Sequence, residues 1–160
     1  MPLAPIDIHA HFYPEELIAL WREEGPRCGG EVVDVEGKGV VLKAGPLATN
    51  PLGPRFSDLD ARLEAMDEQG VAVHALSLSL PMVYWADKAL AQKLSECYND
   101  AAATAFLRHP DRFLAGTDTW MTSRWDALPG SVTEVRSYLS QLPRDVAEKI
   151  AFRNAERLFP

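Results

Sequence analysis

The stretch over residues 57–80 constrains the fold of this chain more than any other segment. Ser57 and Asp60 are placed to cap a helix that runs to about residue 69, and Gly70 ends that helix. A largely apolar strand over residues 71–80 follows immediately. A helix, a glycine and then an apolar strand are typical of α/β proteins, so the sequence predicts an α/β fold with a parallel sheet.

Hydrophobic spacing and turn residues predict the remaining elements. Strands are expected at 5–9 and, barely long enough, at 113–117; helices at 15–24, 87–108, 132–141 and 145–158; a hairpin at 31–43; and a loop at 44–56. The chain has 160 residues, of which 47% are hydrophobic. This length and composition predict one domain with a core of ordinary size.

Charge and cysteine content argue against several classes of function. The net charge of −7, without a basic cluster, argues against nucleic acid or an anionic membrane as a partner. We find no stretch apolar enough to span a bilayer and no signal peptide. Cys28 and Cys97 lie in unlike contexts and suggest no disulfide framework. We therefore expect a soluble, cytoplasmic protein.

The most distinctive chemical motif is Asp-Ile-His-Ala-His at residues 7–11. Side chains alternate along a strand, so Asp7, His9 and His11 would share one face. Two imidazoles on one face can ligate a single divalent metal ion, and imidazole suits zinc, iron and nickel. The alternative is an amphipathic strand with two solvent-facing histidines. Histidine is scarce here, with four in the chain, which favours the metal site.

Several stretches in a fixed order carry a resemblance to a known family. They are residues 6–14, the hairpin at 31–43, and residues 62–71, 98–100, 109–113, 116–118 and 149–159. Together they resemble the amidohydrolase-related metal-dependent hydrolases, in particular the branch containing aminocarboxymuconate-semialdehyde decarboxylase. The resemblance covers nearly the whole chain, and it implies a distorted TIM barrel with a metal at its C-terminal mouth.

The resemblance also implies roles for individual residues. His9 and His11 would be metal ligands, and Asp118 would be a third ligand that accepts the proton of a metal-activated water. The metal would be divalent, with zinc the first expectation. The reaction would be hydrolysis or decarboxylation of a small carboxylated substrate, and the sequence does not separate the two.

The chain departs from the family in its length, because a TIM barrel takes about 250 residues. Residues 1–112 resemble the first two strand–helix units with an inserted hairpin, and residues 116–160 resemble the final strand and closing helices. The resemblance also implies a ligand histidine and a catalytic histidine on the middle strands, and His74 and His109 do not stand in those contexts. We therefore expect a partial, incomplete TIM-barrel-like fold. An alternative to an active enzyme is a catalytically inactive, internally truncated member or a partial gene product with a partial metal site.

The expected topology makes specific geometric predictions. In a closed barrel the first and last strands are neighbours, so the strand through Gly116 should pair in parallel with the strand through Ile8. That pairing would bring Asp118 close to the two histidines. We expect about three or four mostly parallel strands, with an open edge beside the strand at 71–80. An open edge can pair with another chain, which predicts a homo-oligomer.

Four further residues could contact a substrate. Arg55, in the expected loop, and Arg62, on a helix, could bind a carboxylate through two parallel hydrogen bonds. A structural role is favoured for Arg62. Trp120 follows Asp118 closely and is a better candidate for a pocket wall than Trp85.

The remaining polar candidates have structural interpretations. His74 fits a hydrogen-bonded core histidine, and His109 lies where it would favour the negative end of a helix dipole. Asp118 also suits a turn or a helix cap. Asp7 could orient a histidine ring or be an ordinary polar strand residue.

Overall fold

The computed structural model describes residues 5–116 and 122–158. The chain divides into two compact units, which are described separately. The sheet unit consists of residues up to Ala10, residues 70–76 and the residues from Ala103 onward. The hairpin unit consists of residues 11–69 and 77–102.

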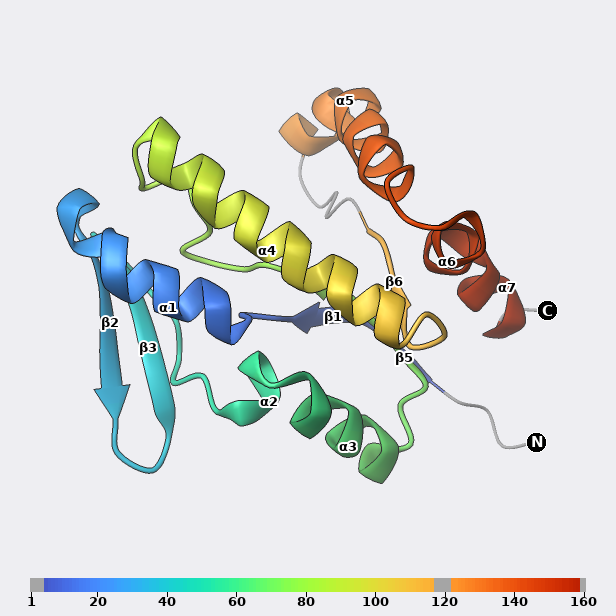
Figure 1. Cartoon of the computed structure of the whole chain (residues 1–160), viewed down its shortest axis with the longest axis horizontal. Helices are drawn as coiled ribbons and strands as arrows, with labels where there is room; N and C mark the ends of the chain where they lie inside the picture. The colour runs from blue at the N-terminus through green and yellow to red at the C-terminus, as the bar shows by residue number, and fades with distance from the viewer. Residues whose placement is uncertain (1–4, 117–121, 159–160) are drawn as a thin grey trace. The chain divides into compact units, whose positions relative to one another are not determined.

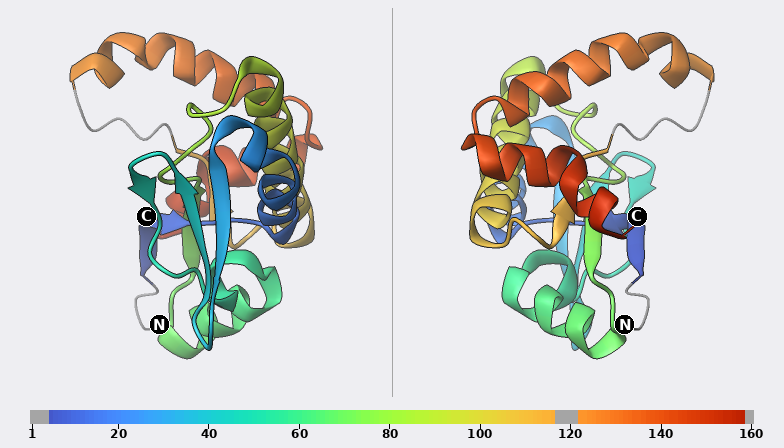
Figure 2. Two further views of the ribbon diagram at one scale, coloured as in Figure 1. Left: turned by 90° about the vertical axis from the view of Figure 1, so that its left-hand side faces the viewer. Right: turned by 90° about the vertical axis from the view of Figure 1, so that its right-hand side faces the viewer.

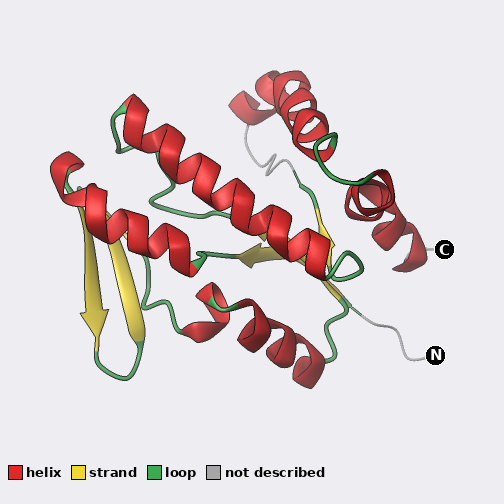
Figure 3. Ribbon diagram, in the orientation of Figure 1, coloured by secondary structure: helices red, strands yellow, loops and turns green. Residues whose placement is uncertain are grey.

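The chain contains both helices and short strands (Figure 3). The strands are β1 (Ile6–His11), β2 (Gly30–Val35), β3 (Gly39–Ala44), β4 (Leu47–Ala48), β5 (Val73–Ser77) and β6 (Phe113–Leu114). The α-helices are α1 (Glu15–Glu24), α2 (Pro54–Ser57), α3 (Leu59–Gln69), α4 (Lys88–Arg108), α5 (Thr122–Leu139), α6 (Arg144–Glu148) and α7 (Asn154–Leu158). A 3₁₀ turn, η1 (Gly25–Cys28), follows α1, and a π-helical turn, η2 (Lys149–Arg153), joins α6 to α7.

In the hairpin unit, α1 runs beside the β2–β3 hairpin (Figure 1). Pro14 precedes the first turn of α1, and Glu15 and Glu16 in that turn favour the positive end of the helix dipole. One face of α1 buries Leu17 and Trp21 completely. The bounds predicted for this helix are confirmed.

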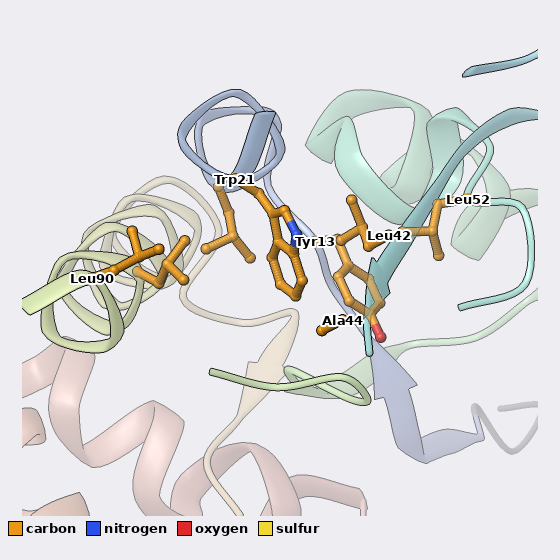
Figure 4. Close-up of a cluster of buried hydrophobic side chains, with 8 residues drawn as sticks. Tyr13, Trp21, Leu42, Ala44, Leu52 and Leu90 are labelled. Atoms are coloured by element: carbon orange, nitrogen blue, oxygen red, sulfur yellow. The ribbon is translucent and has the colours of Figure 1, made fainter. Parts of the chain in front are cut away.

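The core of the hairpin unit joins α1, the hairpin and the start of α4 (Figure 4). Its buried members are Tyr13, Leu17, Trp21, Leu42, Ala44, Leu52, Leu90 and Leu94. The Trp21 and Trp85 rings pack with their centroids 4.5 Å apart, so Trp85 is a packing residue, as favoured from the sequence. A Cβ atom at Gly30 would lie 2.4 Å from the Trp85 ring, so this contact requires glycine.

The predicted hairpin is confirmed, and it extends into a small antiparallel sheet in the order β2-β3-β4. Figure 2 shows the β2–β3 hairpin from two sides. The loop expected at 44–56 was wrong in part, because it contains β4 and α2. The capping prediction for α3 was also wrong: Ser57 belongs to α2, and Asp58 Oδ1 accepts the Asp60 and Ala61 amides, at 2.8 and 3.2 Å.

The sheet unit contains three strands in the order β1-β5-β6. β5 and β6 pair in parallel, with His74 opposite Phe113. β1 also runs parallel to β5, because the Ala72 amide donates to the Pro5 carbonyl and, further along, the Phe12 amide donates to the Ser77 carbonyl. The described residues therefore form a mixed α/β structure with a parallel three-stranded sheet and flanking helices.

Two topological predictions were wrong. The strand before Gly116 pairs with β5 and not with β1. The open edge does not lie beside β5, because β5 is the central strand, and the edges of the described sheet are β1 and β6. The expectation assumed a closed barrel. In this sheet β1 pairs with β5, and β5 pairs with β6, so strands that follow one another along the chain are neighbours instead.

The C-terminal helices differ from their predicted bounds. α5 begins at Thr122, ten residues before the expected start, and it includes Pro129. The helix expected at 145–158 is present as the bent run α6–η2–α7 (Figure 2). Asn154 is buried and joins this run to β6 and to the residues just before it. Its Nδ2 donates to the carbonyls of Pro110 and Phe113 at 2.7 and 2.9 Å. None of the described helices has the length and apolarity needed to cross a bilayer.

Candidate metal-binding site

The two histidines of the sequence motif lie in the second half of β1. Strand alternation places the side chains of His9 and His11 on the same side of the chain. This is the carboxyl end of a parallel strand, where active sites of barrel enzymes lie. Within the sheet unit, His9 is exposed, and its amide donates to Asp7 Oδ1 at 2.9 Å.

Within the hairpin unit, His11 is held at its ring and at its backbone. Nδ1 of the ring lies 2.9 Å from the hydroxyl oxygen of Ser77. The buried Arg62 guanidinium donates a short hydrogen bond to the His11 carbonyl and lies over the Phe12 ring, 5.5 Å from its centroid. This position supports the structural role favoured for Arg62 over carboxylate binding.

In the sheet unit, His74 faces Asp7 rather than a purely apolar core. Its Nε2 lies 3.9 Å from Asp7 Oδ2, and its side chain is 13% exposed. Asp7 thus contacts both the His9 backbone and the His74 ring. The first contact gives the His9 amide an acceptor, which is consistent with Asp7 being an ordinary polar strand residue.

Arg55 lies on α2 and not in a loop, which corrects the prediction. It lines a shallow hollow of about 360 Å³ between α2 and α3, together with Phe56, Glu64 and Glu68. Arg55 Nη2 is 3.7 Å from Glu68 Oε2, and both side chains are largely exposed. Neither His9 nor His11 lines this hollow. A role for Arg55 in substrate binding therefore stays a prediction.

Asp118 and Trp120 lie outside the described residues. Over residues 5–116 and 122–158, no group of three or more His, Cys, Asp or Glu side chains gathers in a way that could hold a metal ion. Both cysteines are free, as predicted. The predicted ligand set His9, His11 and Asp118 therefore stays a prediction.

The sequence analysis missed two polar side chains near the carboxyl ends of β1 and β5. Ser77 contacts His11, and the Tyr13 hydroxyl donates to the Leu80 carbonyl at 2.8 Å. Burial raises the pKa of the Tyr13 hydroxyl above its usual range. The sequence did not mark Ser77 as the end of its strand, because the predicted strand ran to residue 80, whereas β5 ends at Ser77.

Comparison with known proteins identifies the fold. The sequence matches no protein-family model. IDCase from Metarhizium anisopliae, in its apo form, is similar to 86% of this chain, with a TM-score of 0.57 and 20% sequence identity. An amidohydrolase II structure matches 69% of the chain, with a TM-score of 0.45 and 24% identity.

These two matches cover 40% and 29% of the solved chains, so this chain spans less than half their length. The likeness to IDCase shows that this chain shares part of the fold of that protein.

The donor chemistry at the end of β1 fits a divalent metal ion in part. Nδ1 of His11 lies at hydrogen-bond distance from the Ser77 hydroxyl, and in the tautomer whose Nδ1–H donates to that oxygen the electron pair of Nε2 can bind a ligand. Catalytic zinc sites usually hold three protein ligands. His9 belongs to the sheet unit and His11 to the hairpin unit, so their joint ligation of a metal stays a prediction, and it requires a further donor.

Proposed function

We propose that this chain is a metal-dependent hydrolase or decarboxylase of the amidohydrolase superfamily that acts on a small carboxylated substrate. The observation that carries the proposal is the His-x-His pair at the carboxyl end of β1, on a fold shared with IDCase. The aminocarboxymuconate-semialdehyde decarboxylase-like branch is the specific relative that we propose. A TIM-barrel ancestry and a cytoplasmic location belong to the same proposal.

In this proposal, His9, His11 and Asp118 hold the metal, with zinc the first candidate. A divalent ion bound there would make a water molecule acidic enough to act as a nucleophile near neutral pH. The Asp118 carboxylate accepts a proton. Arg55 and Trp120 contact the substrate, and Arg55 offers a guanidinium that fits a carboxylate through two parallel hydrogen bonds. Arg55 would have to leave Glu68 to do so.

A second candidate is a catalytically inactive, internally truncated member that retains a partial metal site. Two observations favour it: the described residues gather fewer than three metal donors, and the match to IDCase spans 40% of that chain. Both candidates require metal binding by the histidines. They differ in whether the loaded protein turns over substrate.

The metal site is tested by titrating the purified chain with Zn²⁺ in a calorimeter. We expect one ion per chain, and at least a tenfold loss of affinity in His9→Ala, His11→Ala and Asp118→Asn. Asp126→Asn, an exposed aspartate of α5, is the matched control and should bind as the wild type does. Equal binding by the wild type and a His9→Ala, His11→Ala double variant would exclude the site.

The two candidates are separated by activity. The Zn²⁺-loaded chain is offered a panel of small carboxylated and amide substrates, with His9→Ala as the control. We expect little or no turnover, because general acid–base assistance is typically worth about 10²–10⁴ in rate and the expected catalytic histidine is lacking. Turnover at ordinary enzyme rates that His9→Ala abolishes would favour the enzyme over the inactive member.

A further inference from the structure

Ser77 fixes the end of β1 at two points. Its hydroxyl oxygen lies 2.9 Å from Nδ1 of His11, and its carbonyl accepts the Phe12 amide at 2.9 Å. One residue at the end of β5 therefore contacts both the His11 ring and the backbone that immediately follows it. All these atoms belong to the hairpin unit.

The backbone around His11 is anchored by further contacts. Arg62 donates to the His11 carbonyl, and the Tyr13 amide donates to the Phe56 carbonyl at 2.8 Å. Phe12 and Tyr13 are both buried. The Cα position of His11 is thus set by its neighbours, and the side-chain torsions are the main freedom left to the ring. The hydrogen bond with the Ser77 hydroxyl restrains those side-chain torsions.

The direction of the hydrogen bond between His11 Nδ1 and the Ser77 hydroxyl depends on which of two tautomers the imidazole adopts. A neutral ring has one N–H donor and one nitrogen with a free electron pair, and only the latter can bind a metal. When Nδ1–H donates to the Ser77 oxygen, the electron pair lies on Nε2. When the serine O–H donates to Nδ1 instead, the proton lies on Nε2.

We propose that Ser77 is a positioning residue for His11. It accepts the Nδ1–H of the ring and thereby sets both the ring orientation and the tautomer, so that Nε2 is the nitrogen presented to a divalent metal. The tautomer assignment concerns the metal-free chain alone. Its consequence for metal binding rests on the proposed function.

The first test measures the tautomer in the whole, metal-free chain by two-bond ¹H–¹⁵N correlation NMR, with His11 assigned by comparison with His11→Gln. We expect the Nδ1–H form in the wild type and in Ser77→Thr, which keeps the hydroxyl. In Ser77→Ala the His11 signals should shift toward the Nε2–H form. An Nε2–H wild type, or an unchanged tautomer in Ser77→Ala, would overturn the proposal.

The second test measures Zn²⁺ affinity by calorimetry. Loss of the partner that orients a metal-binding histidine typically costs about 10–100-fold in affinity, and we expect that loss in Ser77→Ala and not in Ser77→Thr. Ser95→Ala, which removes a hydroxyl bonded within α4, is the matched control. The expected tautomers with no Zn²⁺ binding by the wild type would support Ser77 as the positioning residue and refute the metal site.

Discussion

The hairpin unit and the sheet unit bury their apolar side chains differently. In the hairpin unit, Leu17, Trp21 and Leu42 are fully buried in one cluster. In the sheet unit, Ile8 on β1 is 79% exposed and Trp125 on α5 is 62% exposed. Parallel strands are normally covered on both faces. The difference is local, because Val73 and Phe113 of the sheet unit are fully buried, and Leu80 and Tyr84 of the hairpin unit are 56% and 76% exposed. It separates the packed cluster around α1 from the exposed apolar side chains on β1 and α5.

The strongest test of this contrast is a matched pair of tryptophan substitutions. Trp21→Ala should lower the free energy of unfolding by about 3–5 kcal/mol, because it opens a large cavity in a packed core. Trp125→Ala removes an exposed ring and should change it by no more than about 0.5 kcal/mol. Urea unfolding followed by far-UV circular dichroism measures both. Equal losses would show that the two units do not differ in this way.

A second substitution tests the best-packed part of the sheet unit. Asn154→Ala leaves the buried carbonyls of Pro110 and Phe113 without their donor, and an unsatisfied buried group costs about 1–3 kcal/mol. We expect a loss of about 2 kcal/mol in urea unfolding. The exposed Asn50→Ala is the control. A loss no larger than that of the control would mean that Asn154 does not join the C-terminal helices to the strand.

A third substitution tests the uncovered surface. Ile8→Lys should change the free energy of unfolding by no more than about 0.5 kcal/mol, because the side chain is exposed. The homo-oligomer was predicted through an edge beside the strand at 71–80, but that strand is central, and β1 is one of the two edges of the described sheet. If copies pair through β1 instead, the lysine should also block that pairing. Sedimentation velocity at micromolar concentration should then show a larger species for the wild type than for the variant. A monomeric wild type would argue against this homo-oligomer.

The smallest expected effect is a pH dependence in the hairpin unit. The Arg27 guanidinium beside Asp87 lowers the pKa of that carboxyl from 3.8 to about 2. A lowered folded-state pKa contributes stability above the unfolded value, and that stability is lost as pH falls from about 4 to about 2. The effect should be slight, because the pair is exposed.

Asp87→Asn is the variant that isolates this effect. Asparagine can still accept the Leu90 amide at the start of α4, so the cap is kept and only the charge is lost. The difference in melting temperature between wild type and variant should shrink between pH 4 and pH 2. A difference that stays constant over that range would show that it does not come from the ionised Asp87–Arg27 pair.

Local signals predicted the helices with strong boundaries. Pro14 and Gly25-Pro26 delimit α1, and His109-Pro110 ends α4, whose observed start is one residue from the prediction. These boundaries depend on residues adjacent in sequence. The pairing of β6 with β5 depends on which strands are available, and no local pattern encodes that. The wrong pairing was predicted because the family that the sequence resembles has a closed barrel, in which the first and last strands are neighbours.

In the candidate metal-binding site, too, local features could be predicted from sequence and contacts between distant segments could not. The strand that carries His9 and His11 was readable from sequence, because alternation is a local property. Contacts between segments were not predicted: Ser77 is 66 residues from His11, and the ion pair of Arg55 with Glu68 joins α3 to α2, where the sequence predicted a loop. Asp118 and Trp120 remain predictions.

The π-helical turn η2 makes the C-terminal run sensitive to its length. A π turn accommodates one extra residue within an α-helix. Here the Ile150 carbonyl accepts the Ala115 amide at 3.1 Å, while Lys149 at the first position of the turn and Arg157 after it both reach Asp111. Deleting one residue from 149–153 would remove the extra residue, and the run could continue as a regular α-helix with Asn154 in nearly the same direction. Inserting one more residue would instead rotate the rest of the helix by about 100° and turn Asn154 away from its two carbonyls. This segment should therefore accept many outward-facing substitutions and some single-residue deletions during evolution but few single-residue insertions, since the direction of Asn154 holds it to β6.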